Sequence, residues 1–385
     1  MYRSREFIRV YLMQVFYLFA IVFSWSFVYM HLMRAGFSFA DMFLFKLASY
    51  SSAVVLMLFL KQIDTMKSIG IGSIAFALEL AAIPFIHGTS SLVLLGLFDG
   101  LTFPLFWIPY NNLYFSLGKR QESAYLAGLT FLLPPIFCII LPFASGLIID
   151  SYGTGIVLLI GAAVLLVSGI YFGIQKGGVM NMDFRRSVSA GKGLKALLFI
   201  QGFWHGVDWI CAPLFTLYFF TSGVSYGGFI SFVAVFGAFS TLYFCSVSDR
   251  TGNRVNYLYP SIVMTAAATV MSAFASNMVN WLIVRAIVGF FVAVSNPFTI
   301  SIVLDRMKDT SEAIYLREVM LNVGRTAGIV VVVLCTMFFG GFQNAFIASG
   351  VLLLAYPLLV ERKGLYRVKA RADSIMMDEH LESHD

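Results

Sequence analysis

Seven ionisable side chains lie inside long apolar runs of the sequence: Lys46, Glu79, Asp99, His205, Asp208, Arg285 and Arg325. A charged group removed from water is costly unless it is paired or hydrogen-bonded. Groups of this kind either form ion pairs that hold segments together or take up and release protons. Their positions are therefore the first candidates for chemistry in this chain.

The strongest cluster is Gln201, His205 and Asp208, spaced i, i+4 and i+7, which places all three on one face of a helix. Apolar surroundings favour the neutral form of a carboxyl group, which suits proton uptake and release. An imidazole titrates near neutral pH. We therefore predict Asp208 as the leading protonation site, with His205 or Arg285 as its partner. A static ion pair is the alternative.

The composition places these residues in a membrane. Of the 385 residues, 59% are hydrophobic and 12% charged, and the mean hydropathy is +0.84. Soluble domains carry roughly 25% charged residues, so the chain lacks the polar surface of a soluble fold. The four cysteines include no C-x-x-C pair, so neither a metal site nor a redox pair is expected. No cofactor is predicted.

Apolar runs separated by short polar segments predict an all-α protein with twelve transmembrane helices. The expected spans are 7–32, 40–60, 68–87, 90–117, 124–149, 154–174, 194–221, 226–247, 256–276, 279–304, 318–340 and 343–360. Residues 175–192 are glycine-rich and basic, without apolar periodicity, and are expected to form a cytoplasmic linker. The predicted units are therefore 1–174, the linker 175–192, 193–361 and a cytoplasmic tail, 362–385.

Basic residues predict the orientation. If the N-terminus is cytoplasmic, all Lys and Arg residues fall in inner segments except Arg34, Lys46, Arg285 and Arg325. This asymmetry follows the positive-inside rule and predicts that both termini of a multi-pass cell-membrane protein are cytoplasmic. The same rule explains the net charge of +6, so nucleic acid is not an expected partner.

One loop motif resembles a known family. The hairpin Cys245-Ser-Val-Ser-Asp-Arg-Thr-Gly-Asn-Arg254 resembles the G-x-x-x-D-R-x-G-R-R signature of the major facilitator superfamily. Asp249, Arg250, Gly252 and Arg254 match the signature, whereas Cys245 and Asn253 depart from it. The equivalent first-half loop keeps Asp64. Arg285-x-x-x-Gly289 is similar to a motif that many members carry in span four, where this chain lacks the arginine.

The resemblance implies two six-helix bundles that alternate access to a central cavity. In this superfamily spans one, four, seven and ten usually line that cavity, and Asp99, His205, Asp208 and Arg285 lie on three of them. The resemblance also implies that Asp249, Arg250, Arg254 and Asp64 form latches that close the cytoplasmic side. Asp64 could pair with Arg325. Simple anchoring of loops at the headgroups is the alternative.

Polar and aromatic residues of the same spans are expected to face the solute. Span one offers Gln14 and Tyr17, and span seven offers Gln201. Span four contributes Trp107 and Asn111, near two prolines that loosen its backbone. Asn296 of span ten precedes a proline. Lys46 is expected to pair with Glu79 as a structural contact.

These patterns predict a secondary active transporter that moves a small organic solute, acts as a monomer and is coupled to protons. No Walker A motif is present, so ATP-driven pumping is not expected. Export and import remain open. The alternative is a non-transporting membrane sensor or assembly protein that keeps the transporter fold. A membrane-embedded enzyme is disfavoured because no nucleophile–base pair or metal motif was found in the sequence.

Overall fold

The computed structural model describes residues 5–117, 123–251 and 255–364, without the side chains of 123–125, 245–251 and 255. Nearly all of these residues are helical. The first half contains α1 (Arg5–Phe23), η1 (Trp25–Phe27), α2 (Val28–Arg34), α3 (Phe39–Phe59), α4 (Thr65–Ala82), η2 (Ile83–Phe85), α5 (Thr89–Ser116), α6 (Ser123–Tyr152) and α7 (Thr154–Gly173). The second half contains α9 (Lys195–Thr216), α10 (Gly223–Thr251), α11 (Val255–Ser272), α12 (Met278–Arg306), α13 (Thr310–Phe339), α14 (Gln343–Leu353) and α15 (Ala355–Arg362).

The chain is a multi-pass membrane protein. Within the described ranges, ten helical segments are long and apolar enough to cross a bilayer, counting α1 with α2 and α14 with α15 as single spans. Helices α9 and α11 lie at the predicted seventh and ninth spans but are not among the ten. The predicted helical membrane architecture is therefore confirmed, whereas the count of twelve spans stays a prediction.

Side-chain caps explain where several spans begin. Ser38 and Asp41 form a reciprocal capping box at the start of α3. Asn277 caps α12. Asp309 caps α13, which begins at Thr310 rather than at the predicted residue 318. The charged turn before residue 318 is therefore helical, since the cap satisfies the free backbone N–H groups of the first turn.

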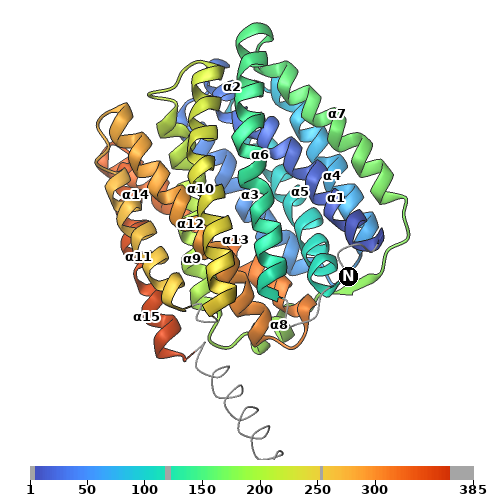
Figure 1. Ribbon diagram of the computed structural model, residues 1–385. Helices are drawn as coiled ribbons and strands as arrows, with labels where there is room; N and C mark the ends of the chain where they lie inside the picture. Colours follow the sequence, from blue (N-terminus) through green and yellow to red (C-terminus); the bar gives the residue numbers. More distant parts are fainter. Residues whose placement is uncertain (1–4, 118–122, 252–254, 365–385) are drawn as a thin grey trace, which may run out of the picture.

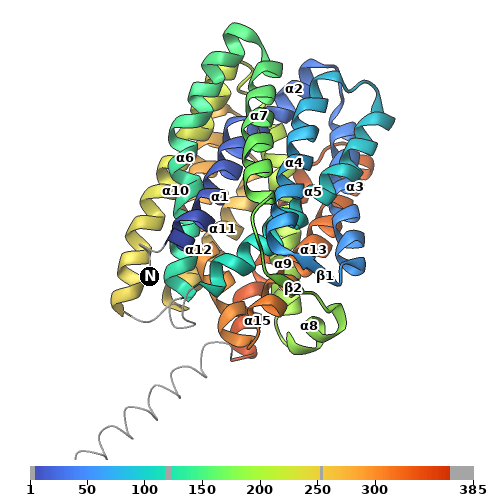
Figure 2. The same cartoon turned by 90° about the vertical axis from the view of Figure 1, so that its right-hand side faces the viewer.

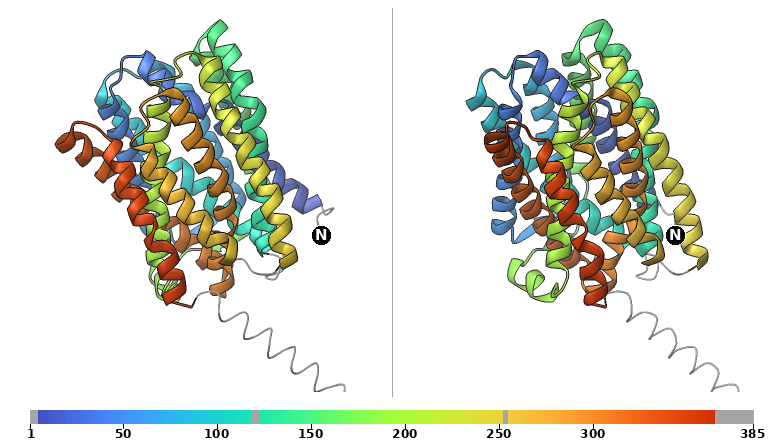
Figure 3. Two further views of the ribbon diagram at one scale, coloured as in Figure 1. Left: turned by 60° about the vertical axis from the view of Figure 1, so that its left-hand side comes forward. Right: turned by 90° about the vertical axis from the view of Figure 1, so that its left-hand side faces the viewer.

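Helices of each half pack mainly against one another, for example α4 against α7 and α9 against α13. Two long contacts join the halves: α6 lies beside α10, and α3 lies beside α13 (Figures 1 and 2). The N-terminal end of α1 and the end of α15 lie at the same end of the molecule (Figure 3). We call this the terminal end.

The segment predicted as a linker, 175–192, contains a short strand and a short helix. Strand β2 (Val179–Asn181) pairs antiparallel with β1 (Gln62–Asp64), and the short helix α8 (Phe184–Ala190) follows it (Figure 2). The pairing brings Gln62 opposite Asn181. Strand pairing satisfies the backbone of two polar segments that have no apolar periodicity of their own, so the sequence pattern did not indicate it.

Candidate functional site

A cavity of about 560 Å³ lies between the two halves. Its walls come from α1, η1, α2, α3, α4, α5 and α6 of the first half and from α9, α12 and α13 of the second. The charged residues that line it are Lys46, Asp99, Asp208, Arg285 and Arg325. The wall is also rich in aromatic residues: Tyr17, Trp25, Tyr29, Tyr50, Phe76, Phe103, Trp107 and Trp209.

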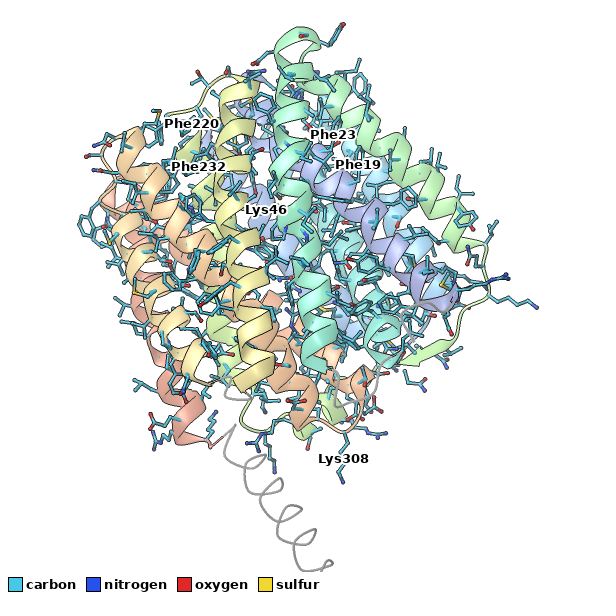
Figure 4. The ribbon with its side chains drawn as sticks, in the orientation of Figure 1. Phe19, Phe23, Lys46, Phe220, Phe232 and Lys308 are labelled. Carbon is cyan, nitrogen blue, oxygen red and sulfur yellow. The ribbon has the colours of Figure 1, made fainter. Side chains whose placement is uncertain are left out.

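In the first half, Lys46 of α3 forms an ion pair with Asp99 of α5, with Nζ 2.7 Å from Oδ2. Both side chains are buried, and Lys46 lies in the middle of the helical body (Figure 4). Two glycines of α5 allow it to pack closely against α3 beside this ion pair. A Cβ atom at Gly96 would lie 2.4 Å from the Phe45 carbonyl oxygen, and one at Gly100 would lie 2.0 Å from that of Ser49. Only glycine permits so close an approach of α5 to α3.

The expected pairing of Lys46 with Glu79 is therefore wrong, because Asp99 takes that place. Glu79 lies on α4 with an exposed fraction of 0%. Neither of its carboxyl oxygens has a hydrogen-bond partner among the described residues.

In the second half, Asp208 of α9 pairs with Arg285 of α12. Arg285 Nη1 donates to Asp208 Oδ1 over 2.6 Å, and Nη2 donates to Oδ2 over 3.0 Å. Of the two expected partners of Asp208, the structure thus pairs it with Arg285. The bidentate geometry fixes the direction of both side chains.

His205 lies about one turn away from Asp208 along α9. It lines a smaller cavity of about 150 Å³ together with Gln14, Trp107 and Asn111. Its ring stacks on Trp209, with centroids 4.3 Å apart, and its Nδ1 has no partner among the described residues. The structure therefore does not bring His205 to Asp208.

Arg325 of α13 stands between the two cavities and lines both. Its guanidinium carbon lies 4.7 Å from the Trp209 ring centroid and 5.3 Å from that of Phe103. Nη1 donates to Asn322 over 3.1 Å, and the carboxylate oxygen Oε2 of Glu318 is 4.0 Å away. No described group accepts a hydrogen bond from Arg325 Nε.

Close packing of α9 and α13 holds Arg325 in this position. A Cβ atom at Gly202 would lie 2.2 Å from the Leu321 carbonyl oxygen, and one at Gly206 would lie 2.3 Å from that of Arg325. Gly324 and Gly328 meet the backbone of α9 in the same way. These are two G-x-x-x-G pairs, the pattern that lets helices pack backbone to backbone in membranes.

The expected solute-facing residues divide among four cavities. Tyr17 and Trp107 line the large cavity, where Tyr17 stacks on Phe106. Gln14 and Asn111 line the smaller one, but the Gln14 amide is engaged by Tyr110 and Thr130. Gln201 donates to Thr299 and lines a void of about 20 Å³.

Asn296 lies at both smaller cavities and at a separate cavity of about 500 Å³ between α6, α9, α10 and α12.

The expected latch between Asp64 and Arg325 is not formed. Asp64 Oδ1 instead accepts from the Lys67 backbone N–H over 3.0 Å and caps α4. Asp249 and Arg250 lie in the last turn of α10, where side chains are outside the described part, and Arg254 lies outside the described residues altogether. Their latch roles stay predictions.

Contacts join the two halves at both ends of the molecule. At the terminal end, the Tyr315 hydroxyl donates to the Met57 carbonyl, and Ser311 donates to Asn112 over 2.9 Å. At the opposite end, Phe342 packs on Phe39 and Phe43.

Asp150 forms a further contact between the two halves at the opposite end. Its two carboxylate oxygens accept from the backbone N–H groups of Gly223, over 2.6 Å, and Val224, over 2.9 Å, at the start of α10. The roles of Asp150 and Trp209 were not expected from the sequence. For Asp150 the available signal was an acidic residue at a span end, and for Trp209 it was an aromatic residue directly after Asp208.

Comparisons with known proteins identify the fold. No protein-family model and no curated protein sequence matches the chain. The crystal structure of the E. coli fucose:proton symporter FucP is similar over 92% of this chain and 97% of that one, with a TM-score of 0.64 and 15% identity. The human organic anion transporter MFSD10 (TETRAN) is similar over 93% of this chain and 100% of that one, with a TM-score of 0.66 and 12% identity. The chain therefore shares the fold of these two structures, which agrees with the resemblance of the loop motif.

Proposed function

We propose that the protein is a secondary active transporter that carries a small organic solute across the cell membrane by alternating access. The observation that carries this proposal is the cavity of about 560 Å³ between the halves, with cross-half contacts at both ends of the molecule. Such a cavity opens to one side at a time when one set of contacts breaks and the other holds. Transport, rather than catalysis, is the use that this arrangement suits.

The finer architecture belongs to the same proposal. Helices α9 and α11 would be the two remaining spans, giving twelve, and residues 1–174 and 193–361 would form two six-helix bundles. Both termini would be cytoplasmic, because the basic loops lie at their end of the molecule. The protein would act as a monomer.

The charges in the cavity favour a solute that carries an anionic group. Lys46 and Arg285 are each bonded to an aspartate, whereas the nearest carboxylate oxygen to Arg325 is 4.0 Å away. Arg325 can therefore offer a charge-assisted hydrogen bond to a carboxylate or phosphate. The surrounding aromatic rings would hold an apolar or aromatic body. MFSD10 is an organic anion transporter, which agrees with this solute class.

Proton coupling is proposed through Asp208. Protonation of this carboxylate would release Arg285 from a bidentate pair that joins α9 to α12, and so would change the cavity walls. FucP is a proton symporter with the same fold.

Proteoliposomes with an interior pH dye test the proposal directly. We expect one or more aromatic carboxylates from a panel of metabolites to change the interior pH with wild-type protein but not with Asp208→Asn. Uptake that stays undiminished and pH-independent in Asp208→Asn would exclude this residue from coupling. Absence of any flux across a broad panel of anionic, neutral and cationic solutes would favour the non-transporting sensor.

A further inference from the structure

Glu79 is a fully buried carboxyl group without a donor. Its exposed fraction is 0%, and no described residue donates a hydrogen bond to either of its oxygens. A buried carboxylate of this kind normally accepts several hydrogen bonds or contacts a cation. The groups around Glu79 therefore decide whether its carboxyl group can carry a negative charge.

The neighbouring helices supply one cation and one further carboxyl group. Glu79 interacts electrostatically with Asp99 of α5 and with Lys46 of α3. Tyr17 of α1 adds an uncharged hydroxyl. Helix α7, which packs along α4, contains no charged residue. The group therefore comprises two carboxyl groups and one lysine.

Lys46 cannot balance both carboxyl groups. Its Nζ is 2.7 Å from Asp99 Oδ2, which already forms a neutral ion pair. An ionised Glu79 would then be a bare charge in an apolar helix bundle, which is costly. Two carboxyl groups can also bond to each other only when one of them carries a proton.

We propose that Glu79 and Asp99 hold one proton between them beside Lys46, and that these three residues form a proton-binding site in the first half of the protein. The proton resides on Glu79, which leaves the negative charge on Asp99 beside Lys46. This site is separate from the Asp208–Arg285 pair, in which each carboxylate oxygen has its own guanidinium nitrogen and no proton is needed.

Infrared spectroscopy of purified protein at neutral pH tests the site without any transport. Wild type is expected to show the C=O band of a protonated carboxyl group that is lost in Glu79→Gln. Asp208→Asn is the matched control and is expected to keep that band, because Asp208 is held as a carboxylate. Persistence of the full band in Glu79→Gln would overturn the proposal.

Thermal unfolding of paired variants provides a second test. Glu79→Gln mimics the protonated side chain, and Asp99→Asn leaves Glu79 as the single carboxylate for Lys46. Each single variant is therefore expected to fold with a small change in Tm. The double variant leaves Lys46 without a carboxylate, so its loss in Tm is expected to exceed the sum of the single losses. A Glu79→Gln protein that fails to fold, or additive losses, would contradict the site.

Coupling of this proton to solute movement rests on the proposed function and is measured separately. If the site is coupled, Glu79→Gln moves solute in proteoliposomes without the proton flux seen in wild type. The infrared result decides whether the proton is bound, whatever the transport result is. Failure of transport alone would thus count against the proposed function and not against the site.

Discussion

Arg285 holds Asp208 through two hydrogen bonds of 2.6 and 3.0 Å, and this pair ties α12 to α9 at the wall of the central cavity. Both side chains are largely shielded from solvent, with exposed fractions of 12% for Arg285 and 6% for Asp208. A pair in this setting stabilises the fold only while both partners are present. The stability of the protein should therefore fall much more when one member of the pair is replaced than when both are replaced.

We expect Asp208→Asn to destabilise the protein by roughly 3–5 kcal/mol, because it leaves the guanidinium of Arg285 buried without a counter-charge. The double variant Asp208→Asn, Arg285→Gln should recover much of this loss. Thermal unfolding in detergent, followed by intrinsic tryptophan fluorescence, measures both. A double variant no more stable than Asp208→Asn would show that the pair contributes little to the fold.

Arg325 is predicted to bind the anionic group of the solute. Removing one charge-assisted hydrogen bond costs about 1.5–3 kcal/mol, so Arg325→Gln should weaken binding of an anionic solute by roughly tenfold to a hundredfold. Arg325→Lys keeps the charge but loses the planar group that stacks on Trp209, so an intermediate loss is expected. Titration with the anionic solute and with its uncharged amide separates charge recognition from packing.

Equal weakening of the anionic and the amide ligand by Arg325→Gln would contradict anion recognition. Unchanged affinity for both would place the solute away from Arg325. Arg317→Gln is a useful control, because Arg317 already contacts Glu318 and does not line the large cavity.

The close contact of α9 and α13 is predicted to depend on Gly206. Its added Cβ would lie 2.3 Å from the carbonyl oxygen of Arg325, so Gly206→Ala must push the two helices apart. We expect a loss of about 1–3 kcal/mol in stability, as for other overpacked sites. Gly155→Ala is the matched control, since its nearest neighbour would be 3.9 Å away. Equal stability of the two variants would contradict this account.

The spans could be predicted from the sequence because long apolar runs leave the chain few other solutions in a membrane. The first residues of individual helices differ from the prediction where a side chain caps the helix, most clearly at Asp309. The strand pair of β1 and β2 could not be predicted, because it joins two short polar segments far apart in the chain. The pairing of Lys46 with Asp99 was also missed. It depends on how far α5 rotates and approaches α3, which Gly96 and Gly100 determine.

The helical face that carries Gln201, His205 and Asp208 illustrates another limit of sequence reasoning. The spacing correctly predicts that the three side chains share a face, but residues seven apart are separated by about 10 Å along a helix. Gln201 and His205 consequently line the same small void, and His205 also lines the cavity of about 150 Å³, whereas Asp208 lines the large cavity. Periodicity gives the direction of a side chain, whereas depth and neighbours come from the packing of the whole protein.

The last prediction concerns Asp150, whose carboxylate joins the two halves at the end opposite the termini. Asp150→Ala removes two hydrogen bonds to the start of α10, which should cost the closed form of this end about 1–2 kcal/mol. We therefore expect this end to open more often. Spin labels at the exposed residues Ala40 and Asn344, in a cysteine-free background, report the change as a longer distance.

Tyr315→Phe provides the matched variant at the terminal end, where it removes the hydroxyl that donates to the Met57 carbonyl. A hydrogen bond of this kind contributes about 1 kcal/mol, so opening of the terminal end should become roughly fivefold more frequent. The distance between spin labels at the exposed residues Lys61 and Lys308 measures this opening. Alternating access requires the two variants to move the two label pairs in opposite directions, because the ends compete for closure. Opening of both ends in either variant would contradict that mechanism.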